Sequence, residues 1–174
     1  MTLDEALVAY HRDVARWCVR LAGPGVDPEA VAQEALIVLV RRFDSIRPPE
    51  APVIKAFLYR TTRLTLRDHS RRAGRKGWRA WLGLEDTEVA DTRSGAEQEL
   101  LTSERTRTIQ AVLDQMKPKH REVLVLRDLE GMSVTDLAKL IGVSRRTAHR
   151  WLDEAEASFR KLAERLDLDL GVRR

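Results

Sequence analysis

The stretch SVTDLAKLIGVSRRTAHR, residues 133–150, decides the fold of the C-terminal part of this 174-residue chain. Its first half has apolar residues at helical spacing, and Gly142 can adopt the positive φ of a tight turn between helices. Ser144 is a suitable N-cap for a second helix whose polar side is rich in arginine. This layout predicts a DNA-reading helix-turn-helix, because arginine suits guanine edges and phosphates. An ordinary helical hairpin with a solvated basic face is the alternative for the motif alone.

Helical spacing continues on both sides of this motif. Pro118 begins a helix with a strongly apolar run over residues 123–129, and the last helix is expected to stop near Gly171. In the N-terminal half, one helix ends before residues 23–25, Asp27 caps a second, and a third covers residues 53–72. No stretch alternates in the manner of a strand. The sequence therefore predicts an all-α protein.

Charge is unevenly distributed along the chain, although the net charge is only +4. Residues 41–79 contain twelve basic and three acidic side chains, whereas residues 85–104 contain seven acidic side chains against Arg93 alone. Four glycines over residues 73–95 mark a linker at this change of sign. We expect two small helical domains, residues 1–77 and 96–170, joined by a flexible acidic linker over residues 78–95.

Two tryptophans, Trp78 and Trp81, lie in the region where this linker begins. Two interpretations stay open for them. The segment forms a short helix that packs on the first domain, or it is a docking segment for a partner.

The residue inventory argues against an enzyme. Cys18 is the only cysteine, which excludes an intrachain disulfide and a cysteine-based zinc site. The four histidines are scattered, and neither a glycine-rich phosphate loop nor an HExxH motif is present. We therefore expect no catalytic residues, no metal and no cofactor. No apolar run is long enough for a membrane span, and the N-terminal residues do not resemble a secretory signal, so a cytoplasmic protein is expected. Trp17 and Cys18 are expected in its core.

Three segments carry a resemblance to a known family: LDQMKPKHREVLVLRDLEGMSVTDLAKLIGVSRRTAHRWLDEAEASFRKL, DPEAVAQEALIVLVRRF and VIKAFLYRTTRLTLRDHSRR. They resemble, in this order, the promoter-binding fourth region, the polymerase-binding helix and the promoter-melting helix of the extracytoplasmic-function (ECF) sigma factors of bacterial RNA polymerase, within the sigma-70 family. The resemblance implies a sigma factor that binds core RNA polymerase and directs promoter recognition, melting and transcription initiation.

The resemblance also implies site residues and partners. A contact with the minus-35 promoter element is expected from residues of the second helix of the motif: Arg145, Arg146, Thr147, His149 and Arg150. A contact with the minus-10 element is expected from the melting helix: Lys55, Phe57, Tyr59, Arg60, Arg63, Arg67 and Arg71. Polymerase binding is expected from a third set: Gln33, Glu34, Ile37 and Arg41. The implied partners are promoter DNA, the beta-prime clamp and beta flap of core polymerase, and an anti-sigma factor. No membrane partner is expected, and the protein is nucleoid-associated when in holoenzyme.

The three aromatic residues near these contacts receive different expectations. Phe57 is expected in the core rather than as a stacking platform, and Tyr59 is the better candidate for an exposed aromatic side chain. Trp151 is expected in the core beneath the recognition helix.

Some positions depart from the family pattern. Ala30 replaces one residue of an acidic pair, and Leu64 replaces an asparagine that could hydrogen-bond base edges. Asp153, Glu154 and Glu156 occupy a commonly basic stretch after the recognition helix. These acids would repel phosphates and confine the DNA contact to residues 145–150.

Two other functions compete with this interpretation. A helix-turn-helix repressor or activator would bind operator DNA as a dimer without polymerase. An adaptor would only dock polymerase or another regulator through the tryptophan-containing linker. Binding to core RNA polymerase separates the first alternative from a sigma factor, and transcription from a promoter library separates the second.

Overall fold

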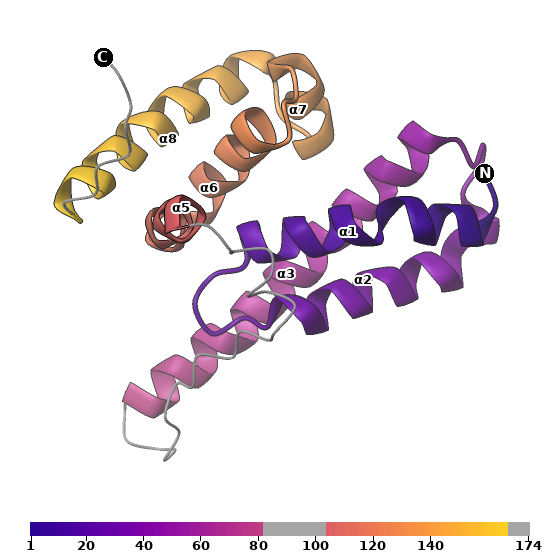
Figure 1. Ribbon diagram of the computed structural model, residues 1–174, viewed down its shortest axis with the longest axis horizontal. Helices are drawn as coiled ribbons and strands as arrows, with labels where there is room; N and C mark the ends of the chain where they lie inside the picture. Colours follow the sequence, from indigo (N-terminus) through magenta and orange to yellow (C-terminus); the bar gives the residue numbers. More distant parts are fainter. Residues whose placement is uncertain (82–103, 167–174) are drawn as a thin grey trace. The chain divides into compact units, whose positions relative to one another are not determined.

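The computed structural model describes the backbone of residues 1–81 and 104–166, and the side chains of residues 1–74 and 106–166. The chain divides into two compact units, Met1–Leu100 and Leu101–Arg174. Every regular element in the described ranges is helical (Figure 1). The all-α prediction is therefore confirmed.

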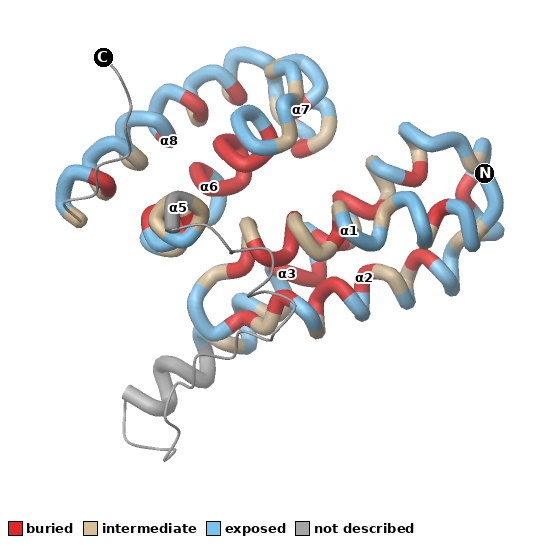
Figure 2. Tube along the Cα trace, in the orientation of Figure 1, coloured by how far each residue is buried: buried red, intermediate tan, exposed pale blue. Residues whose placement is uncertain are grey.

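Three helices form the first unit: α1 (Leu3–Leu21), α2 (Pro28–Arg42) and α3 (Ala51–Trp81). A single 3₁₀ turn, η1 (Phe43–Ser45), follows α2. Each of the three helices packs against the other two, and buried residues line the sides that face one another (Figure 2). The predicted cap of α2 is confirmed, because Asp27 Oδ1 accepts hydrogen bonds from the backbone N–H groups of Glu29 at 2.9 Å and Ala30 at 3.3 Å.

Trp17 of α1 and Tyr59 of α3 form the aromatic centre of this unit. Their rings meet edge to face, with centroids 5.2 Å apart and planes at 81°. Cys18 is also buried, so the core placement predicted for Trp17 and Cys18 is confirmed. The expectation that Tyr59 is an exposed aromatic residue is wrong, because its side chain is 1% exposed. Tyr59 shares the inner face of α3 with Thr62 and Leu66, at the i, i+3, i+7 spacing of one buried stripe.

The third helix is longer than predicted. The sequence predicts its end near residue 72, but α3 continues to Trp81. Single glycines at positions 74 and 77 cost a helix only about 1 kcal/mol each relative to alanine, and their neighbours are mostly good helix formers. The backbone at Trp78 and Trp81 is therefore helical, whereas their side chains and the rest of the predicted linker lie outside the described residues.

The second unit contains α5 (Glu104–Asp114), α6 (Pro118–Leu124), α7 (Val134–Ile141) and α8 (Arg145–Arg165). α8 packs against each of the other three, and the buried residues 120–126 begin in α6 and continue into the turn after it (Figure 2). The last helix ends before the predicted Gly171, with Leu166 as its C-cap.

The apolar run after α6 adopts a π-helical turn, η2 (Val125–Leu129). Glu130 N–H donates to the carbonyl oxygen of Val125 at 3.0 Å, which is the i to i+5 pattern of a π turn. Val125 and Leu126 are buried, but Leu129 is 42% exposed. The wider turn changes the register, so the predicted apolar face does not extend to Leu129.

Candidate nucleic-acid interface

Local hydrogen bonds set the geometry of the helix-turn-helix. Ser133 Oγ accepts from Asp136 N–H at 3.1 Å and begins α7. Gly142 has φ +78°, and the N–H groups of Gly142 and Val143 both donate to Ala138 O at 3.0 Å. Ser144 Oγ then accepts from the backbone N–H of the third residue of α8 at 3.1 Å. The predicted caps and the left-handed glycine turn are therefore confirmed.

The second helix of this motif, α8, presents its basic side chains to solvent. Arg145, Arg146, His149 and Arg150 are exposed, whereas Ala148 is fully buried beneath them. The predicted basic face is therefore exposed, on a helix whose opposite side is buried in the unit.

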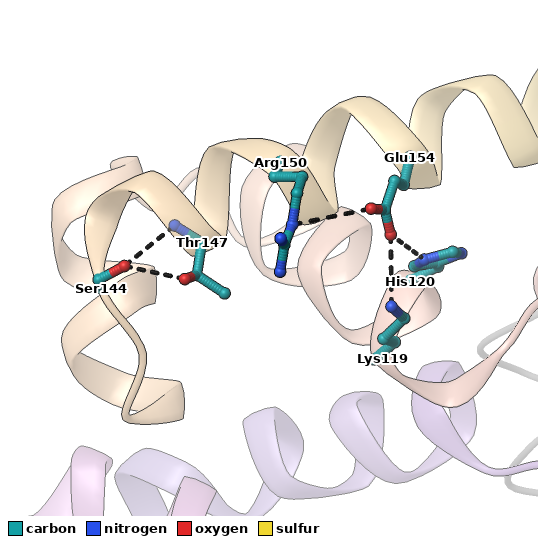
Figure 3. Close-up of polar contacts among 6 residues, drawn as sticks. All are labelled: Lys119, His120, Ser144, Thr147, Arg150 and Glu154. Atoms are coloured by element: carbon teal, nitrogen blue, oxygen red, sulfur yellow. Dashed lines mark hydrogen bonds and ion pairs between the residues drawn. The ribbon is translucent and has the colours of Figure 1, made fainter.

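Thr147 has a local partner. It is half-buried, and its Oγ1 lies 2.9 Å from Ser144 Oγ (Figure 3). This hydroxyl therefore completes the helix cap.

A cluster of charged side chains connects α8 to the start of α6. Glu154 Oε2 accepts from His120 Nε2 at 3.1 Å, with the imidazole proton on Nε2, and from Lys119 Nζ at 3.3 Å. Glu154 Oε1 lies 3.8 Å from Arg150 Nε, one helical turn earlier (Figure 3). The hydrogen bond from His120, followed by that from Lys119, lowers the pKa of the Glu154 carboxyl group below its ordinary value.

This cluster corrects one expectation from the sequence. Glu154 is not a free acid like its neighbours, because three basic side chains surround it. The i, i+4 spacing of Arg150 and Glu154 could have revealed one of these contacts. The two partners on α6 lie 35 and 34 residues away in sequence, and only the fold brings them close.

The core placement expected for Trp151 is wrong in part. Trp151 is half-buried, and Lys119 Nζ lies 5.5 Å from its ring centroid, within the range of a cation–π contact. One face of the indole is therefore covered by a charged side chain of α6.

In the first unit, α3 carries a ridge of exposed basic residues. It comprises Lys55, Arg60, Arg63, Arg67 and Arg71. Arg71 lies 3.8 Å from Asp68 of the same helix. Phe57 is half-buried. Tyr59 is buried on the inner face of α3, so it is not part of the basic ridge.

The predicted polymerase-binding residues share one exposed face of α2. Gln33, Glu34, Ile37 and Arg41 are all exposed there. Ile37 and Val40 are each 49% exposed, which adds apolar area that the sequence analysis did not identify at Val40. Val40 ends the apolar run Ile37-Val38-Leu39, and nothing in that run indicated which of its members would be exposed.

Glu34 also has a contact within the unit. Its Oε2 lies 2.9 Å from His69 Nε2 of α3. Glu34 thus connects α2 to α3 at the edge of this exposed face.

Neither a metal site nor a membrane span is found in the described parts of the chain. No group of three or more histidine, cysteine, aspartate or glutamate residues is placed to hold a metal ion there. None of the described helices is long and apolar enough to cross a bilayer.

Two family models match this chain. The family model described as Sigma-70 region 2 matches residues 7–76, which include the α2 face and the basic ridge of α3. The family model described as Sigma-70, region 4 matches residues 106–159, which include the helix-turn-helix. The chain belongs to the sigma-70 family.

Curated relatives of this sigma-70 family chain include mycobacterial ECF RNA polymerase sigma factors. SigE of Mycolicibacterium smegmatis is 32% identical over 140 residues, which cover 80% of this chain and 53% of SigE. SigD of Mycobacterium tuberculosis is 28% identical over 144 residues, which cover 80% of this chain and 66% of SigD. The chain therefore spans about half the length of SigE and somewhat less than two thirds of SigD.

A solved structure has the same fold as this sigma-70 family chain. It is the sigma factor RpoE from Bartonella quintana, crystallised in complex with the anti-sigma factor NepR. The TM-score is 0.68 at 16% identity, and the match covers 92% of this chain and 96% of the RpoE chain. At 16% identity, this structural similarity shows that the two chains share a fold and nothing more.

Two residues that depart from the sigma-70 family pattern, Ala30 and Leu64, lie beside the predicted contact surfaces. Ala30 is half-buried in the first turn of α2, next to the exposed polymerase-binding set. Leu64 is 52% exposed on α3, between Arg60 and Arg67 of the basic ridge. An apolar side chain therefore stands on the ridge where the family usually has asparagine.

Proposed function

We propose that this chain is a sigma factor: it binds core RNA polymerase and directs promoter recognition, promoter melting and transcription initiation. The observation that carries the proposal is the pairing of two DNA-suited surfaces in one chain. A basic ridge lies on α3 in the region 2 unit, and a capped, arginine-rich α8 lies in the region 4 unit. Two small units in one chain that each contact one promoter element bind more tightly than either unit alone, because binding of one raises the effective concentration of the other.

In this proposal α8 reads the minus-35 element in the major groove. Arg145, Arg146 and His149 carry the contact because their side chains are exposed and near the N-terminal end of the helix. Thr147 and Arg150 rank second, since each has a partner within the unit. A bidentate contact from arginine to guanine contributes about 1–3 kcal/mol of discrimination, whereas phosphate contacts set affinity and salt dependence.

The α3 ridge contacts the minus-10 element in this proposal. Its exposed lysine and arginine side chains neutralise phosphates along one helix face, and the partly exposed Phe57 is the aromatic residue available near them. Tyr59 is omitted because it is buried.

The exposed α2 face binds the polymerase clamp, with Ile37 and Val40 as its apolar part. The beta flap is the second polymerase contact that we propose. The curated relatives are named RNA polymerase sigma factors, and the structural neighbour was crystallised with an anti-sigma factor. We infer that an anti-sigma factor is also a partner of this chain. The role that we propose for this chain is regulatory and not catalytic. The chain acts in the cytoplasm, and at the nucleoid when it is part of the holoenzyme.

The test is reconstitution with purified core RNA polymerase. The chain should co-elute with core enzyme and support initiation from members of a promoter library that core enzyme alone does not transcribe. Failure to bind core enzyme, together with tight dimeric binding to a palindromic duplex, would instead indicate an operator-binding repressor or activator.

A further inference from the structure

Glu154 differs from the acidic residues beside it on α8. Its carboxylate contacts Lys119, His120 and Arg150. Neither Asp153 nor Glu156 has an ion-pair partner among the described residues. Glu154 is therefore the one of these three acids that has ion-pair partners in the described part of the chain, although its side chain is itself 43% exposed.

The position of Glu154 on the helix links it to the proposed DNA contact. Arg146, Arg150 and Glu154 are spaced by four residues and so form one row along α8. Arg150 stands between the N-terminal turn and Glu154, with its side chain 68% exposed (Figure 3). Its guanidinium group can pair with a DNA phosphate or with Glu154, and in the structure it lies beside Glu154.

His120 holds the carboxylate in this position. Its side chain is 9% exposed, so it is not available to DNA, and its Nε2 fixes Oε2 of Glu154 against α6. The other oxygen, Oε1, is the one nearer Arg150. The carboxylate is thus anchored from the protein interior while it neutralises cations at the surface.

We propose that Glu154 is a specificity-determining residue of the DNA-binding unit. It pairs with Arg150 and Lys119 and withholds both cations from the phosphates of DNA of any sequence. This inference rests on the proposed function, because it requires that α8 binds DNA. Phosphate contacts supply most non-specific affinity, whereas base contacts supply discrimination. Withholding cations therefore raises the share of the binding free energy that comes from the base-reading N-terminal turn.

The test compares Glu154→Gln with wild type in the full-length chain. Affinity for a random-sequence duplex is measured by fluorescence anisotropy over about 50 to 200 mM salt. Each released cation that contacts a phosphate should steepen the slope of log affinity against log salt by about 0.9. Over this range the affinity advantage of the variant should therefore shrink about three- to fourfold for each released cation, and about twelvefold when both contact phosphates. The ratio of promoter to random-duplex affinity should fall.

Glu156→Gln is the matched control. It removes the same charge from the same helix, but Glu156 has no ion-pair partner among the described residues. It should leave the salt slope close to that of wild type. Equal affinities and equal slopes for the two variants, with wild type binding DNA, would overturn the role of Glu154 and leave the proposed function standing.

Arg150→Gln provides a second test of the role of Glu154, and it leaves the contacts of Glu154 with α6 in place. In the Glu154→Gln background it should remove the part of the steeper slope that comes from Arg150, about 0.9, and in the wild-type background it should lower the slope by clearly less. A decrease in slope of about 0.9 in the wild-type background would overturn the proposal even if Glu154→Gln failed to fold. Absence of duplex binding by wild type, alone and with core polymerase, would overturn both the proposed function and this inference.

Discussion

The indole of Trp17 and the phenol ring of Tyr59 meet edge to face across α1 and α3, with 5.2 Å between ring centroids. Both side chains are almost fully buried. An aromatic residue that the sequence places beside a basic ridge is thus part of the core.

Tyr59→Ala should therefore act on stability. Truncation of a buried aromatic side chain costs about 3–5 kcal/mol, so the thermal midpoint of the first unit should fall sharply. Tyr59→Phe keeps the ring contact and should cost much less. Thermal denaturation followed by circular dichroism measures both. Wild-type stability in Tyr59→Ala, with loss of minus-10 recognition, would show that the side chain contacts DNA.

Arg145→Ala and Arg146→Ala should each lower initiation from promoters that depend on the minus-35 element. A lost base contact costs about 1–3 kcal/mol of discrimination, while binding to core polymerase should be unchanged because the proposed clamp contact lies on α2 in the other unit. Transcription and polymerase-binding assays on the same preparations measure the two effects. Arg160→Ala, an exposed arginine near the other end of α8, is the matched control. Equal loss of both activities would contradict a minus-35 role.

Arg63→Ala and Arg67→Ala should impair open-complex formation more than duplex binding, because the α3 ridge is proposed to hold the melted strand. Permanganate reactivity of unpaired thymines reports the melting. Arg12→Ala removes an exposed arginine from α1 of the same unit and is expected to have little effect. Permanganate reactivity in the ridge variants equal to that of wild type would refute the assignment.

Cys18 should be unreactive in the folded protein. Burial raises the pKa of its thiol to about 12, so the nucleophilic thiolate is nearly absent at neutral pH. Modification by a thiol reagent such as 5,5′-dithiobis(2-nitrobenzoate) should be slow in native buffer and rapid in denaturant. Rapid stoichiometric modification under native conditions would indicate an accessible thiol and a candidate oxidant sensor.

The contacts of Glu154 should appear in the pH dependence of stability. Its pKa in the folded state lies below the ordinary value of 4.5, chiefly through the hydrogen bond from His120. Its contribution is therefore fully present above pH 4.5 and lost as the pH falls through the lowered pKa. Denaturant unfolding of the wild type from about pH 6 to about pH 3 should show a steeper loss than that of Glu154→Gln. Parallel curves for the two proteins would contradict this.

Local chemistry in the sequence determined the helices and their caps, whereas the C-terminal ends of α3 and α8 differ from the prediction. Ser133, Gly142 and Ser144 act on backbone groups within a few residues, so their roles follow from residue type and spacing. The same holds for Asp27 at the start of α2. The exposed arginines of α8 and α3 followed from helical periodicity alone.

Tertiary structure decided the partners of individual side chains. The inner position of Tyr59 depends on the approach of α1, and the contacts of Glu154 depend on α6, whose residues lie 34 and 35 positions earlier. Helical spacing predicts which residues share a face, but a helix has several faces and the packing of its neighbours selects the buried one. For this reason an apparent surface tyrosine is a core residue, and an apparent repulsive acid contacts Lys119, Arg150 and His120.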